Sequence, residues 1–159
     1  MKKLLILLLL PLFSFSQSYS DIMSIKSLDT FKKVAIENNF EYSDSEEDLR
    51  VTYGYNIQKD SIDGDRATKW MHYTPRDERF GLSISKSGFF GATDDTEYDK
   101  ILAEVKEKCT YFKILNAYGD DYACYTCPES KYKGKIGFML EDEQGFIRTF
   151  PDSKSIARD

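Results

Sequence analysis

Runs in which every second residue is apolar recur along this 159-residue chain, and they constrain its fold more than any other feature. The clearest run has apolar side chains at Leu49, Val51, Tyr53, Tyr55 and Ile57. Successive side chains of a strand point to opposite faces, so this run predicts a strand with one buried and one solvated face. Comparable patterns predict further strands at 67–74, 80–84, 111–118, 122–127, 136–140 and 146–150. The polar stretch 43–48, which precedes the first run, is expected to be a loop.

Two other segments have helical spacing. Leu28, Phe31 and Ala35 follow Ser27, a residue type favoured at helix N-caps, which predicts a helix at 28–38 or one that begins earlier, near Asp21. A second helix is predicted at 96–108, where the residues on one face are Ile101, Leu102, Val105 and Cys109.

These elements predict an α+β fold, an antiparallel sheet of about seven to eight strands with two helices on one face. Each half of the chain reads as a helix followed by a meander. A shift of about 70 residues places Phe31 on Ile101 and Ala35 on Val105. In one interpretation, segments 27–86 and 96–151 are therefore two tandem units.

The N-terminus has the pattern of a secretory signal, with two lysines before an apolar run from Leu4 to Leu12 and small residues at Ser14 and Ser16. A membrane anchor is the alternative, but the run is shorter than the roughly 20 residues that span a bilayer as a helix. We therefore predict a cleaved signal peptide at 1–16, a single domain at 17–151 and a polar tail at 152–159. The protein is then secreted or periplasmic, with no stable membrane insertion after signal cleavage.

Removal of residues 1–16 takes away two lysines and changes the formal net charge from −5 to −7 over 143 residues. An acidic chain is a poor nucleic-acid binder, because basic residues must neutralise the phosphates. The glycines form no phosphate-binding pattern, and segment 60–65 lacks the alternating acids and distal Glu of an EF-hand loop. No metal, cofactor or nucleic-acid partner is expected.

Three cysteines, Cys109, Cys124 and Cys127, can oxidise in an exported protein. Cys124 and Cys127 have CxxC spacing, but they lie on a predicted strand instead of opening a helix as redox pairs do. Positions three apart on a strand point to opposite faces, so these two thiols are poorly placed to bridge. If 111–118 and 122–127 form a hairpin, Cys109 lies nearer to Cys127. The predicted disulfide is Cys109–Cys127, with Cys124 as a spare thiol.

The predicted strand 67–74 carries the only Trp and the only His of the chain. If Met71 and Tyr73 face the helices, Trp70 and His72 lie on the open face of the sheet. Arg50 and Arg79 would share that face and form a binding surface, since Trp and Arg are favoured interface anchors. The alternative is an inverted alternation with Trp70 in the core, because a single Trp in a small domain is usually well buried.

No residue pattern of a catalytic site is present, since no nucleophile-elbow or papain-like context surrounds any Ser or Cys. The expected function is that of a small exported, non-catalytic binding or protein-interaction domain, with a protein or small-molecule partner at the open sheet face. The alternative is a small exported enzyme, a hydrolase or a thiol-based one, that uses His72 or Cys124. A purely structural envelope component is a third interpretation.

Overall fold

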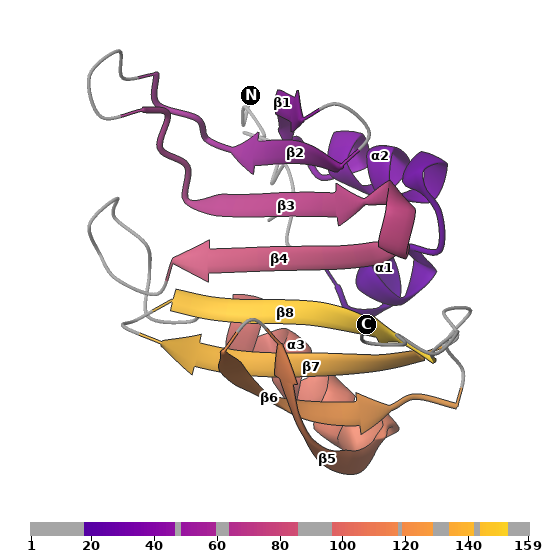
Figure 1. Ribbon diagram of the computed structural model, residues 1–159. Helices are drawn as coiled ribbons and strands as arrows, with labels where there is room; N and C mark the ends of the chain where they lie inside the picture. The colour runs from indigo at the N-terminus through magenta and orange to yellow at the C-terminus, as the bar shows by residue number, and fades with distance from the viewer. Residues whose placement is uncertain are drawn as a thin grey trace, which may run out of the picture.

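The computed structural model of the chain describes residues 18–46, 49–59, 64–85, 97–117, 119–128, 134–141 and 144–152 (Figure 1). The predicted signal peptide at 1–16, and the predicted tail apart from Asp152, lie outside the described residues. In the described part of the chain, no helix is long and apolar enough to cross a membrane.

The described residues form three α-helices and one antiparallel sheet of eight strands, an α+β fold as predicted. The helices are α1 (Tyr19–Ser24), α2 (Leu28–Glu37) and α3 (Glu97–Lys108). The first four strands are β1 (Glu41–Glu46), β2 (Arg50–Tyr55), β3 (Lys69–Thr74) and β4 (Arg79–Ser85). The last four are β5 (Thr110–Ala117), β6 (Asp120–Thr126), β7 (Gly134–Glu141) and β8 (Gln144–Pro151).

The sheet consists of two meanders that join along one seam. Its strand order is β1-β2-β3-β4-β8-β7-β6-β5, so β4 of the first meander pairs with β8 of the second. The last backbone pair of the seam is Gly81–Arg148. Beyond it, the buried Thr149 hydroxyl accepts a hydrogen bond from the Phe80 N–H at 2.8 Å and donates one to the Phe80 carbonyl at 3.3 Å. A side chain thus continues the ladder where backbone pairing stops.

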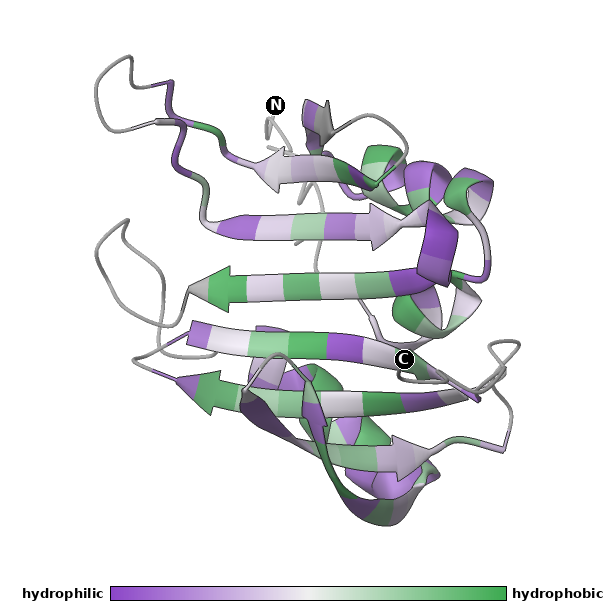
Figure 2. Ribbon diagram, in the orientation of Figure 1, coloured by the Kyte–Doolittle hydropathy of each residue, from purple (hydrophilic) through white to green (hydrophobic). Residues whose placement is uncertain are grey.

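All three helices lie behind the sheet in the view of Figure 1, and the core fills the space between them and the sheet. Phe31 of α2 is fully buried and stacks on Tyr73 of β3, with ring centroids 5.5 Å apart. Tyr98 of α3 packs edge-on against Phe138 of β7 at 5.8 Å. Apolar residues alternate with polar or small ones along β4 in Figure 2, as expected for a strand with one buried face.

In each half, helical structure precedes four strands, with two helices, α1 and α2, in the first half and one, α3, in the second. Phe31 and Ala35 of α2 are fully buried, and so are Ile101 and Val105 of α3, which correspond to them under the 70-residue shift. A duplication would produce this arrangement, and the tandem repeat stays a prediction.

Two elements differ from the sequence expectation. β1 occupies most of the stretch expected to be a loop, because an edge strand is held by backbone pairing to β2 and can carry charged side chains on a polar sequence. The first helix is divided in two. Ser18 and Asp21 form a capping box at the start of α1. Ser27 and Thr30 form a second capping box, so α2 begins as a separate helix.

A disulfide joins Cys109, which follows α3, to Cys127, which follows β6, with 4.4 Å between the Cα atoms. This is the pair predicted from the sequence. The Tyr19 hydroxyl lies 3.5 Å from Cys109 Sγ, so α1 packs beside the same bridge. The disulfide therefore ties α3 to the sheet near the first helix.

Replacing Thr149 by Val should lower the free energy of unfolding by about 1–3 kcal/mol, because the isosteric side chain leaves two buried backbone groups of Phe80 without partners. Urea denaturation measures this loss. Thr149→Ser keeps the hydroxyl and should lose clearly less. Equal stability of the Val variant and the wild type would contradict the role given to this hydroxyl.

Reduction of Cys109–Cys127 should cost about 3 kcal/mol of stability, since the bridge closes a loop of 18 residues in the unfolded chain. The measurement compares urea unfolding with and without dithiothreitol. The double variant Cys109→Ala/Cys127→Ala should show a similar loss and no further response to the reductant. An unchanged unfolding midpoint of the wild type in the presence of the reductant would contradict this stabilising role of the disulfide.

Candidate functional site

The face of the sheet that points away from the helices is called the open face here, and it faces the viewer in Figure 1. Met71 and Tyr73 are buried against the helices, so the residues between and beside them, Trp70 and His72, point to the open face. Trp70 is half-buried and lies outside the core cluster, which excludes the alternative in which it is a core residue.

Cross-strand pairing arranges the open face in rows. The central row runs across seven strands and both meanders, in the order Thr52, His72, Gly81, Arg148, Gly137, Cys124 and Lys113. Beside it runs a more apolar row made of Gly54, Trp70, Ser83, Phe146 and Met139. Basic and aromatic side chains from distant parts of the chain therefore share one surface.

Three of the four predicted binding residues lie together. Arg50, Trp70 and His72 line one hollow of about 340 Å³, called the Trp70 hollow, whose other lining residues are Ser43, Asp44, Thr52 and Asp65. Arg79 occupies an open-face position opposite Thr74, at the start of β4, and does not line this hollow. The structure thus brings Arg50, Trp70 and His72 together and leaves Arg79 apart from them.

Glycines on the neighbouring strands let the two large rings of β3 lie flat on the sheet. A Cβ at Gly81 would overlap the His72 imidazole, and one at Gly54 would come within 2.8 Å of Trp70 Cζ3. Each ring therefore covers a glycine of the adjacent strand. A side chain at either glycine would therefore displace the ring that lies over it.

His72 is uncharged at neutral pH. Burial of the imidazole, together with the positive charges of Arg148 and Arg50, lowers its pKa from 6.5 to about 4. Within the described residues, no hydrogen bond joins His72 to a hydroxyl, thiol or carboxylate. A general base needs a reacting group within hydrogen-bond reach and a pKa near the working pH, and His72 meets neither condition here.

Cys124 is the free cysteine of the described residues, and it is fully buried. Its Sγ donates to the Tyr122 carbonyl at 3.4 Å, and burial raises the pKa of the thiol to about 11. Four strand spacings of roughly 4.8 Å, on the order of 19 Å in all, separate Cys124 from His72 along the central row. The two residues named for the enzyme alternative therefore form no nucleophile–base pair.

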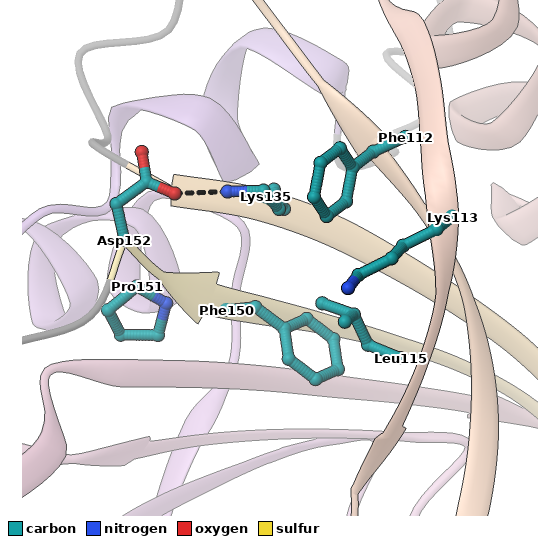
Figure 3. A pocket seen from close by; sticks show the side chains of 7 residues that line it. All are labelled: Phe112, Lys113, Leu115, Lys135, Phe150, Pro151 and Asp152. Carbon is teal, nitrogen blue, oxygen red and sulfur yellow. Dashed lines mark hydrogen bonds and ion pairs between the residues drawn. The ribbon is translucent and has the colours of Figure 1, made fainter. Parts of the chain in front are cut away.

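The sequence analysis missed Arg148, which occupies the centre of the open face with its guanidinium 5.4 Å from the centroid of the Tyr122 ring. It also missed a second hollow of about 330 Å³ on the other side of the seam, where β5 approaches β7 and β8 (Figure 3). The alternation of β8 did contain a signal for this surface. Phe146, Arg148 and Phe150 alternate with Ile147 and therefore share the face of the strand opposite to the one that Ile147 occupies. The pattern does not tell which strands pair with β8, so the neighbours of Arg148 and Phe150 could not be predicted.

No group of three or more His, Cys, Asp or Glu side chains in the described ranges is placed to hold a metal ion. Comparison with known protein families, with curated proteins and with solved structures gives no significant match. The side chains of the site are therefore the evidence for function in this chain.

Folding stability should depend on His72 in the acid range. Its pKa is lower in the native state than in the unfolded chain, so between pH 6.5 and 4 the unfolded chain binds a proton that the native protein does not. The stability that neutral His72 contributes is complete above pH 6.5 and falls by about 3 kcal/mol as the pH drops to 4. The variant His72→Gln should not show this pH-dependent loss of stability. The measurement compares the urea unfolding midpoints of the wild type and the variant between pH 6.5 and pH 4.

The single His also permits a direct measurement of its pKa by NMR. The wild type should titrate near pH 4, and Gly81→Ala, which pushes the imidazole towards solvent, should titrate closer to 6.5. Titration of the wild-type ring near 6.5 would contradict the desolvation of the imidazole in the native state.

Proposed function

We propose that this protein is a small exported, non-catalytic binding domain that engages a protein partner through the open face, with the Trp70 hollow as the centre of contact. The observation that carries the proposal is the hollow itself, which places a half-buried Trp beside Arg50 on a helix-free sheet surface. Trp and Arg are the residue types that most often dominate the binding energy of protein interfaces.

Charge distribution supports the same surface. The chain is acidic overall, yet basic residues occupy open-face positions, namely Arg50, Arg79, Arg148, Lys113 and Lys135. Acidic residues of this face, such as Asp44, Asp120 and Glu141, belong to the edge strand β1 or to strand ends. The complementary partner surface would present an apolar side chain towards Trp70 and a carboxylate towards Arg50, on the side away from Asp44 and Asp65, which line the same hollow.

Export is part of the proposal. The disulfide Cys109–Cys127 suits an oxidising compartment, and the sequence at 1–16 has the pattern of a cleaved secretory signal. The geometry of His72 and Cys124 gives the enzyme alternative no support, because the imidazole has a low pKa and the thiol is buried far from it.

Trp70→Ala should reduce partner capture at least tenfold, because an anchor residue of an interface typically contributes more than 1.4 kcal/mol. The protein, immobilised as bait, is exposed to an envelope fraction, captured proteins are identified by mass spectrometry, and the purified partner is then titrated by calorimetry. The matched control is Ile36→Ala, an exposed apolar residue of α2 on the other side of the molecule, which should bind as the wild type does.

Intrinsic fluorescence gives an independent readout, since Trp70 is the only Trp of the chain. Binding on the open face must shift or quench its emission. A partner that binds the wild type and the Trp70→Ala variant equally and leaves this emission unchanged would refute the proposed surface.

A further inference from the structure

The second hollow of the open face, called the Phe150 hollow, combines apolar walls with two lysines. Figure 3 shows the rings of Phe112 and Phe150 at its two sides, with the end of Lys113 between them and Leu115 beside Phe150. Lys135 lies beside Phe112 and points to Asp152. Its volume of about 330 Å³ lies at the lower end of the roughly 300–1,000 Å³ found for ligand sites. Such a space suits a small molecule.

The wall formed by Phe150 is fixed in place. A Cβ at Gly137 would come within 2.6 Å of Phe150 Cε2, so the ring lies over this glycine. The ring also packs edge-on against Tyr122, with centroids 5.5 Å apart. The opposite wall is more open, because Phe112 lies at a register irregularity of β5 and 46% of its surface is exposed.

Both ammonium groups lie close to the same aromatic ring. Lys135 Nζ is 4.7 Å from the centroid of Phe112, and Lys113 Nζ is 5.3 Å from it. In Figure 3 the Lys113 side chain extends into the hollow towards Phe150 and Leu115. Positive charge is thus concentrated beside an apolar surface.

One carboxylate already binds at the rim. Asp152, just beyond β8, forms an ion pair with Lys135, and its side chain is largely exposed. The pair shows that a carboxylate fits against Lys135 at this position. The Asp152 side of the pair is exposed, whereas the Lys135 side chain is mostly buried, so a ligand carboxylate that replaces Asp152 keeps the buried ammonium group paired.

We propose that the Phe150 hollow binds a small carboxylate that carries an apolar or aromatic group. The carboxylate contacts Lys113 and Lys135, and the apolar group packs between Phe112 and Phe150. Asp152 is an internal competitor for the same lysine. A polyanion is a poorer fit, since the walls are apolar and one of the two charges is already partly neutralised.

This inference goes beyond the proposed function, because the Phe150 hollow and the Trp70 hollow share no lining residue. The two hollows lie on opposite sides of the seam between β4 and β8, one lined by residues of the first half of the chain and the other by residues of the second. Ligand binding in the Phe150 hollow and partner binding at the Trp70 hollow can therefore succeed or fail separately.

The test measures binding of 3-phenylpropanoate to the full protein by calorimetry and NMR. The neutral 3-phenylpropanamide and the small anion acetate serve as probes that each lack one half of the proposed chemistry, and both should bind at least tenfold more weakly. Lys113→Gln should weaken 3-phenylpropanoate binding at least fivefold. Asp152→Asn should strengthen it several-fold, which a merely structural role of Asp152 would not do.

Lys106→Gln, at an exposed position on α3, is the matched control for charge, and Trp70→Ala is the control for the other hollow. Both should bind 3-phenylpropanoate as the wild type does. Equal binding of the amide, an unchanged affinity of Lys113→Gln or Asp152→Asn, or no binding at millimolar concentration would each overturn the proposal.

The same chemistry is offered by a free acid and by the carboxyl terminus of a peptide that ends in an apolar residue. Acetyl-Gly-Gly-Phe is therefore tested beside 3-phenylpropanoate, with its C-terminal amide as control. The tighter of the two carboxylates identifies the source, and binding of neither overturns the proposal.

Discussion

The seam between β4 and β8 is the interaction on which the rest of the structure depends. Each meander alone would be a four-stranded sheet with two free edges, and the seam turns the pair into one continuous surface. The Thr149 hydroxyl completes it where backbone pairing ends. Behind the sheet, Lys69 of β3 and Glu97 of α3 form a largely buried ion pair, so the two halves are also joined on the helix side. Because the pairing of β4 with β8 aligns the two meanders, the sheet has one continuous buried face towards the helices and one continuous open face on the other side.

Each hollow of the open face draws mainly on one meander, and the seam lies between them. The Trp70 hollow is built chiefly from the first half of the chain, and the Phe150 hollow from the second. In both, an aromatic ring lies over a glycine of a neighbouring strand, and basic side chains line the same hollow. If the chain arose by duplication, the two hollows lie on two copies of the same meander whose side chains have diverged.

Local patterns were sufficient for much of this architecture and for one half of the site. The alternation of Val51 and Tyr53 marked a strand because its period is set by the backbone, and Met71 with Tyr73 determined which way Trp70 and His72 point. β1 gave no such signal, since an edge strand held by backbone bonds needs no apolar face. Arg148 and the Phe150 hollow depend on which strands become neighbours, and that is decided by contacts between residues far apart in the sequence, such as Phe80 and Thr149.

The arrangement of the cysteines has a consequence for how the protein matures. Three thiols allow three pairings, and the shortest loop would join Cys124 to Cys127. In the folded chain these two neighbours on β6 and its end are kept apart, one fully buried between strands and the other bonded to Cys109 across the helix side. The correct bridge is thus selected by the pleat of β6 and not by proximity along the chain. A chain whose β6 has not yet paired lacks this selection, because nothing then holds Cys124 and Cys127 apart.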